Sequence, residues 1–327
     1  MEPLPERCTV CVVLRDRFST TFRCLDDLIA FTPEPYDLVV ILGGTPLTVR
    51  SELEKRYASK ARFLFVEPFL NQAEFRNIAL RETKTDLVAI LDNDVYVRAG
   101  WLPSMVRCLR ETGAALVTPV VLEKPTVIHT AGNSLMITHK DGKPYGQKEL
   151  RYAKLIYYES SDLKRAPVDY GELHCQLLRA DVARRLGIFD EKLHEQTEVD
   201  SGLLMTRGGQ AMWFEPTSVV HFDFPGRITR AEDIRPFLFK WDSGRIVKSM
   251  EYFQKKWGVD ITEGGTFEGF THYINQKLGL WSRLFPSHAS VLADESYHRL
   301  KNLLGGPIQA WRMLKNRISG SQRWKKP

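Results

Sequence analysis

The sequence lacks several features that would place it in a special class of protein. It contains no apolar run of the roughly 18 residues that a membrane-spanning helix needs. The N-terminal segment MEPLPERCTV has no apolar core of the signal-peptide type. The five cysteines are odd in number and mostly scattered, as in proteins whose thiols stay reduced. We therefore expect a cytoplasmic globular protein, and 43% hydrophobic and 26% charged residues are ordinary values for one.

Acidic residues are absent after Glu295, whereas eight lysines and arginines follow it. Because the whole chain carries a net charge of only +6, the basic character belongs to this tail and the rest is slightly acidic. One helical face in the tail can carry four apolar residues: Ile308, Trp311, Leu314 and Ile318. Such a helix is typical of peripheral binding to an anionic membrane surface. The alternatives are packing on the rest of the chain or binding a partner or a nucleic acid; of these we expect no nucleic acid, and the oligomeric state stays open.

Short apolar runs alternate with amphipathic segments over residues 1–121. Five runs have the composition of strands buried on both faces: TVCVVL (9–14), YDLVVIL (36–42), ARFLFV (61–66), DLVAIL (86–91) and AALVTPVV (114–121). In NQAEFRNIALRET, Asn71 and Glu74 have the spacing of a capping box. This alternation implies right-handed crossovers and a mostly parallel sheet flanked by helices, an α/β fold.

The remaining chain divides into three parts. Residues 122–165 are polar and irregular, with KDGKPYGQK as a loop or hairpin, and residues 167–222 form a second ordered block. Residues 223–327 read as mostly helical. We predict one domain over 1–222, with halves 1–121 and 122–222, followed by a helical C-terminal region over 223–327.

Two carboxylates follow the fourth apolar run directly, in DLVAILDNDVYVRAGWL, which continues as a helix-like segment. Asp92, Asn93 and Asp94 should lie at the carboxyl end of a strand, where sheets of this kind bind ligands. Two neighbouring carboxylates repel each other unless a cation or a proton intervenes, and such oxygen ligands suit Mg²⁺ or Mn²⁺. The alternative is an Asx-type turn that caps the following helix.

Six segments, in order, resemble motifs of the family 2 glycosyltransferases, which have the GT-A fold and use nucleotide sugars with inversion. They are VVLRDRFSTTFRCLDDL, NQAEFRNIAL, DLVAILDNDVYVRAGWL, HTAGN, HCQLLRADVARRLGIFDE and TEVDSGLLMTRGGQAMWFEPTSVVH. The resemblance covers residues 8–222. It implies a nucleotide-diphosphate sugar as donor and Mn²⁺ or Mg²⁺ as cofactor. It also implies a glycan acceptor, which could be lipid-linked at the cytoplasmic membrane face.

The resemblance assigns the donor site residue by residue. Asp92 and Asp94 would hold the metal and the donor, with Asp94 the direct ligand, Asn93 beside them and His221 a further ligand. Four more residues would contact the nucleotide: Arg76 and Asn77 on the nucleotide side of the site, and Asp16 and Arg17 near the base. The family usually has an Asp after its second strand, whereas this chain has ILGGTP. Backbone N–H groups of Gly43 and Gly44 could replace that Asp, which leaves the nucleobase open.

The resemblance places the general base at Glu198, where the family has an aspartate, and a second acid at Asp200. Because the two acids are two residues apart at the start of a helix, they cannot both face one acceptor, so one should be catalytic and the other structural. The alternative is a capping box in which Thr197 is the N-cap. His174 is predicted to be a packed or hydrogen-bonded histidine.

Three other functions fit parts of the pattern. A nucleotidyltransferase would show a glycine-rich phosphate loop after the first strand, and VVLRDRFS has no glycine. A metal-dependent phosphohydrolase would need further Asp and His ligands clustered at strand ends, and these are not evident in the sequence. A non-catalytic protein that binds nucleotide sugars or glycans on a degenerate GT-A fold is the main alternative, because the Asp after the second strand is absent and Glu replaces Asp at position 198.

Overall fold

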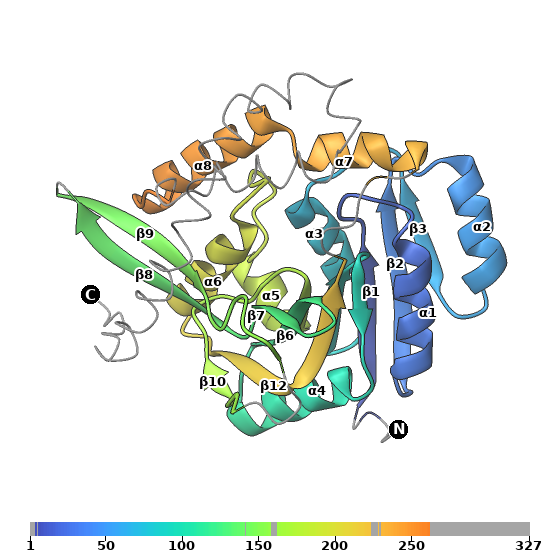
Figure 1. Cartoon of the computed structure of the whole chain (residues 1–327), viewed down its shortest axis with the longest axis horizontal. Helices are drawn as coiled ribbons and strands as arrows, with labels where there is room; N and C mark the ends of the chain where they lie inside the picture. Colours follow the sequence, from blue (N-terminus) through green and yellow to red (C-terminus); the bar gives the residue numbers. More distant parts are fainter. Residues whose placement is uncertain are drawn as a thin grey trace.

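The computed structural model describes residues 4 and 6–261, apart from 141, 158–161, 224–227 and 229. A ten-stranded mixed sheet forms the centre of the fold (Figure 1). Its strand order is β10-β12-β6-β11-β4-β1-β2-β3, with β5 paired to β12 and β7 to β6. Strands β1–β4, β6 and β12 run in one direction and β11, β5, β7 and β10 in the other. The predicted α/β fold with a mostly parallel sheet is therefore confirmed.

The N-terminal half has the predicted strand–helix alternation. Its strands are β1 (Cys8–Val13), β2 (Tyr36–Gly43), β3 (Arg62–Val66) and β4 (Leu87–Asp92). Its helices are α1 (Thr21–Phe31), α2 (Leu47–Tyr57) and α3 (Gln72–Glu82). All residues of β1 and β4 are buried, because helices cover both faces of the sheet: α1 and α2 lie on one side and α3 on the other (Figure 1). The capping box of Asn71 and Glu74 at the start of α3 is present as predicted.

The chain after β4 differs from the prediction of an immediate helix. A short strand, β5 (Val95–Val97), comes first and pairs with the end of β12 (Met212–Phe222). Helix α4 (Trp101–Thr112) begins only after Gly100, whose φ of +83° reverses the chain. The β-branched Val95 and Val97 favour the extended form, and pairing with Val220 and Phe222 stabilises it. The two aspartates are thereby held between two strands rather than at a helix start.

Residues 122–165 are more regular than predicted. β6 (Leu116–Lys124) continues into β7 (Val127–Thr130), and β8 (Asn133–Lys140) and β9 (Lys143–Leu150) form a two-stranded hairpin outside the main sheet. The hairpin was one of the two predicted forms of KDGKPYGQK. The hairpin stands away from the main sheet (Figure 1), so its strands are not buried on both faces and need no long apolar run.

The second ordered block supplies the centre of the sheet and the helices near the site. β10 (Ala166–Pro167) is an edge strand, and β11 (Cys175–Arg179) lies antiparallel between β4 and β6. Helices α5 (Ala180–Leu186) and α6 (Thr197–Arg207) follow. This arrangement brings the segment before β11 next to the aspartates at the end of β4, since the backbone N–H of Asp92 donates to the carbonyl of His174 at 3.1 Å.

The C-terminal region is helical where the structure describes it. A 3₁₀ turn, η1 (Ala231–Asp233), leads into α7 (Ile234–Lys240) and α8 (Ser243–Trp257), which lie across one end of the molecule (Figure 1). The Asp233 carboxylate accepts from the backbone N–H groups of Phe18 and Ser19 at 2.7 and 3.1 Å, which fastens this region to the loop after β1. No helix in the described part of the chain is long and apolar enough to cross a membrane. The basic tail with its predicted amphipathic helix lies outside the described residues.

Candidate functional site

Asp92, Asn93 and Asp94 form a buried turn between β4 and β5, each at most 2% exposed. Asn93 ties this turn to the loop after β1. Its side-chain oxygen accepts from the backbone N–H of Arg15 at 2.9 Å, and its amide donates to the carbonyl of Arg17 at 2.6 Å and to Thr21 Oγ1 at 2.8 Å. Both amide hydrogens of Asn93 are thus engaged within the protein. Asn93 therefore positions the turn and does not contact a nucleotide through its amide.

Arg76 forms a buried, hydrogen-bonded ion pair with Asp92. The guanidinium is fully buried, and its Nη2 donates to Asp92 Oδ1 at 2.7 Å and to the carbonyl of Leu173 at 2.6 Å. Its Nη1 donates to the side chain of Gln72. Burial alone would raise the pKa of Asp92, but Arg76, His174 and Arg15 outweigh burial and hold that pKa below its usual range. Because Arg76 is fully buried, it acts on Asp92 and does not reach a nucleotide directly.

Asp94 lies between two further arginines. Its Oδ2 is 3.8 Å from Nη1 of Arg15 and 4.0 Å from Nη2 of Arg17, distances of ion pairs without short hydrogen bonds. Arg17 also donates to Asp223 Oδ2 at 2.7 Å. Burial lowers the pKa of Arg17, but Asp16, Asp94 and Asp223 outweigh it and raise that pKa. The end of β4 is therefore a dense network of carboxylates and guanidinium groups.

The other predicted nucleotide contacts lie away from this turn or are engaged within the protein. Asp16 is fully buried and accepts from the indole N–H of Trp241 at 3.0 Å. The amide of Asn77 donates to the carbonyl of Phe189 and to Glu191 at 2.9 and 2.8 Å. A Cβ on Gly43 would meet the carbonyl oxygen of Pro68 at 2.5 Å, so glycine permits a close backbone approach here.

The proposed role of Gly44 as an N–H donor meets an obstacle. Its backbone N–H donates to the carbonyl of Val66 at 2.9 Å, so this group is engaged within the protein. Asp16, Asn77, Gly43 and Gly44 are thus placed by contacts inside the fold.

His221 faces away from the cluster of Asp92. It lies in β12 opposite Tyr96, and the next residue, Phe222, stacks on His174 with 4.4 Å between ring centroids. Successive strand residues point to opposite faces, so His221 points the other way. Burial, then Arg98 and Arg23, lower the pKa of His221 to about 4. Two neighbouring cations disfavour a metal ion there, and we leave His221 out of the metal site.

Glu198 and Asp200 begin α6 and point to different surroundings. Glu198 Oε1 accepts from Nζ of Lys148 in β9 at 2.9 Å. Burial would raise the pKa of Glu198, but Lys148 outweighs it and lowers that pKa. Asp200 instead accepts from the indole of Trp257 and pairs with Lys256, each at 2.7 Å. Glu198 therefore contacts β9, and Asp200 contacts α8.

The capping box predicted at Thr197 does not form. The N-cap of α6 is Gln196, in the left-handed conformation with φ of +67°, and it makes no side-chain cap hydrogen bond. Thr197 is already the first helical residue, and the Asp200 side chain is engaged by α8 instead. The rigidity of this helix start comes from tertiary contacts.

Replacing Asp200 by Asn should destabilise the protein by about 1–3 kcal/mol, because a buried charge-assisted contact with Lys256 is lost while Lys256 keeps Asp190. Urea unfolding measures this change. Nucleotide binding should be retained. Loss of activity at unchanged stability would show that Asp200, and not Glu198, is the general base.

Three side chains without a predicted place in the site lie near Asp92: His174, Glu172 and His129. His174 Nδ1 is 3.4 Å from Asp92 Oδ2, so it is the hydrogen-bonded histidine predicted, but it lies beside the aspartates. Glu172 follows, and burial and then the charge of Glu198 raise its pKa. His129 packs against His174 with 5.4 Å between ring centroids. HTAGN contains His129, but this motif does not indicate which residues from other strands lie next to it in the fold.

The fold agrees with what known proteins show. Residues 9–187 match the model of glycosyl transferase family 2, which is more than half of the chain, and the chain belongs to that family. The chain resembles the pre-mycofactocin glycosyltransferase of Mycobacterium tuberculosis, in strains CDC 1551 / Oshkosh and ATCC 25618 / H37Rv, at 29% identity over 156 residues. That match covers 46% of this chain and 30% of the relative, so the chain spans less than a third of the relative's length.

A solved structure shares the fold. GalNAc-T7, crystallised with UDP, GalNAc and Mn²⁺, superposes with a TM-score of 0.54 at 14% identity, over 89% of this chain and 56% of that one. At this identity the likeness supports the GT-A fold and nothing finer. The fold expected from the six motifs is thus confirmed.

Proposed function

We propose that this protein transfers a sugar, of the hexosyl type, from a nucleotide-diphosphate sugar to an acceptor hydroxyl with inversion. One observation carries the proposal: Asp92 contacts His174, His174 is grouped with Glu172, and Glu172 lies near enough to Glu198 at the start of α6 for the two charges to interact. In α/β sheets of this kind, ligands bind beyond the carboxyl ends of the strands. A donor held at Asp92 and Asp94 would therefore present its sugar toward Glu198.

The donor end of the cluster fits Mn²⁺ or Mg²⁺ by ligand type, because Asp92 and Asp94 bring two buried carboxylates to one turn. Asp92 has one oxygen held by Arg76, which orients the other toward His174 and the site. When bound, the metal would neutralise charge that develops on the departing diphosphate. Arg15 and Arg17 would support the same charge from the loop after β1.

The acceptor end supplies the general base. Lys148 keeps the pKa of Glu198 low, so this carboxylate is ionised at neutral pH and can accept the proton of an attacking hydroxyl. Lys148 holds Oε1, and we assign proton transfer to Oε2. Because α6 is fixed by Asp200 and α8, the base is held on a rigid element.

The acceptor is proposed to be a glycan or a lipid-linked saccharide. The predicted attraction of residues 296–327 to an anionic membrane would bring the enzyme to such an acceptor. Vesicle sedimentation of the whole chain and of a chain lacking 296–327 tests this. Loss of sedimentation on truncation supports it, and equal sedimentation contradicts it.

The donor half is tested by thermal unfolding with UDP, GDP or dTDP, each with and without Mn²⁺. A ligand at about 100 times its Kd stabilises the folded state by about 2.7 kcal/mol, so one diphosphate should raise Tm by several degrees with Mn²⁺ and much less without it. Asp94→Asn should remove the Mn²⁺-dependent part and change Tm of the free protein little. No Tm increase with any of the three would contradict the proposed donor site.

A further inference from the structure

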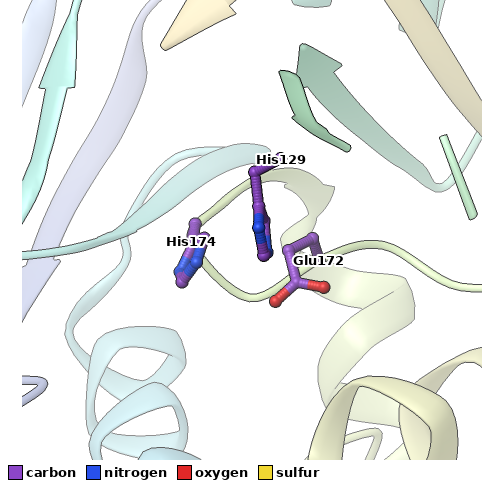
Figure 2. A group of neighbouring side chains, drawn as sticks. All are labelled: His129, Glu172 and His174. Carbon is purple, nitrogen blue, oxygen red and sulfur yellow. The ribbon is translucent and has the colours of Figure 1, made fainter. Parts of the chain in front are cut away.

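A second group of ligand-type side chains lies beside the aspartate turn, and the proposed transfer gives none of them a catalytic role. His129 comes from β7, and Glu172 and His174 come from the segment before β11. One nitrogen or oxygen atom from each lies within 4.8 Å of the others. Figure 2 shows the two imidazole rings and the carboxylate turned toward a common space. Among the described residues this is a compact set of two imidazoles and one carboxylate.

Both rings are already oriented by a second carboxylate. Nδ1 of His129 is 3.6 Å from Glu123 Oε2, and Nδ1 of His174 is 3.4 Å from Asp92 Oδ2. Metal-binding histidines usually have such a carboxylate at the nitrogen that does not bind the metal. Each ring keeps Nε2 as a nitrogen that does not face this carboxylate and can serve as a ligand atom. Phe222 packs on both rings, with centroid distances of 4.8 and 4.4 Å, and limits their rotation.

We propose that His129, Glu172 and His174 bind a transition-metal ion of the Zn²⁺ class, at a site separate from the Asp92–Asp94 site. Two imidazoles and one carboxylate are a ligand set of zinc sites with an open fourth position, and imidazole also suits Co²⁺ and Ni²⁺. Mg²⁺ prefers oxygen ligands throughout. Ligand atoms around tetrahedral zinc are about 3.3–3.5 Å apart for bonds near 2.0–2.1 Å. Closing the gap from 4.8 Å needs a modest rotation, which the half-buried Glu172 allows.

Arg15 competes with the ion in the present arrangement. Its Nη1 lies 2.6 Å from Nδ1 and 3.1 Å from Nε2 of His174. A guanidinium and a metal ion cannot both contact Nε2, so Arg15 turns aside when the metal binds; Asp92 and Asp94, each 3.8 Å away, are alternative partners. Removing the Arg15 side chain should therefore leave metal binding unchanged or tighten it.

The test is titration of the full-length protein with Co²⁺ in the absence of nucleotide, followed by the visible absorption of bound cobalt, with Zn²⁺ as competitor. One saturable site, displaced by Zn²⁺, is expected. His129→Ala and Glu172→Gln should weaken Co²⁺ binding by at least about tenfold, since each removes a ligand. Arg15→Met should bind as tightly or more tightly. One control should bind like the unchanged protein: His139→Ala, an exposed histidine on the hairpin. Asp94→Asn should keep saturable Co²⁺ binding, because Arg15 can still pair with Asp92.

The variants separate this site from the donor site. Binding lost in Asp94→Asn and kept in Glu172→Gln would place the ion at the aspartate turn and overturn the inference. Absence of saturable Co²⁺ binding would overturn it as well. Melting curves without metal show whether each variant folds, and Glu172→Gln decides if His129→Ala does not, because Gln keeps the size of the side chain. The Co²⁺ titration tests this metal site whether or not the nucleotide–Mn²⁺ test supports the proposed donor site.

Discussion

Replacing Glu198 by Gln is expected to slow sugar transfer by about 10²–10⁴-fold, because Gln keeps the shape of the side chain but cannot accept the proton of the acceptor hydroxyl. Donor binding should be unchanged, since the nucleotide is held at the other end of the cluster. Rates of nucleoside-diphosphate release with acceptor present, together with Tm increases on donor binding, separate the two effects. An active Glu198→Gln variant would show that the base lies elsewhere.

Lys148→Met is the matched control for this base. Burial and Lys148 act in opposite directions on Glu198, and Lys148 keeps the pKa low. Without the lysine the pKa of Glu198 should rise, so the acid limb of the transfer rate should move to higher pH while a substantial rate remains at alkaline pH. An unchanged acid limb would show that this limb does not report Glu198.

Replacing Arg76 by Met is expected to destabilise the fold by about 3–5 kcal/mol. The guanidinium is fully buried, and its removal takes the hydrogen bonds at 2.7 and 2.6 Å from the Asp92 carboxylate and the carbonyl of Leu173. Urea unfolding at neutral pH measures the loss. Arg76→Lys should lose less, because the positive charge remains. A loss below about 1 kcal/mol would contradict this account of Asp92.

A double-mutant cycle tests whether Arg76 acts through Asp92. Asp92→Asn in the Arg76→Met background should cost much less than Asp92→Asn alone, because the unpaired charge has already been created. The pair also predicts an acid effect. The pKa of Asp92 is lowered in the folded state, so its contribution is present above about pH 4, the usual range for Asp, and is lost as pH falls below it. Strictly additive losses would show that the two side chains are independent.

Much of the fold was predictable because local patterns decide it. The five apolar runs become β1–β4 and β6 with boundaries shifted by three residues at most, since strands buried on both faces need continuous apolar sequence. The capping box at Asn71 was also predictable, because a cap involves residues only three apart. The hairpin β8–β9 was only partly predictable, because its residues are neither continuously apolar nor clearly alternating.

The site was predictable only where its residues adjoin a strand end. Asp92 and Asp94 follow β4 directly, so topology places them. His129, Glu172 and Lys148 come from β7, the segment before β11 and β9, and only the pairing of distant strands brings them together. The environment of Asp200 depends on α8, 56 residues later in the chain. No local pattern carries such information.

The most direct test of the central claim is release of nucleoside diphosphate from a panel of nucleotide sugars by the full-length protein with Mn²⁺ present. We predict that one donor is hydrolysed slowly without acceptor, that Asp94→Asn abolishes this release, and that Glu198→Gln keeps donor binding. Binding of a nucleotide sugar with no release under any condition would contradict the account and favour a binding protein on the same fold. Equal release by Asp94→Asn would also contradict it, because the aspartate turn would then have no part in the chemistry.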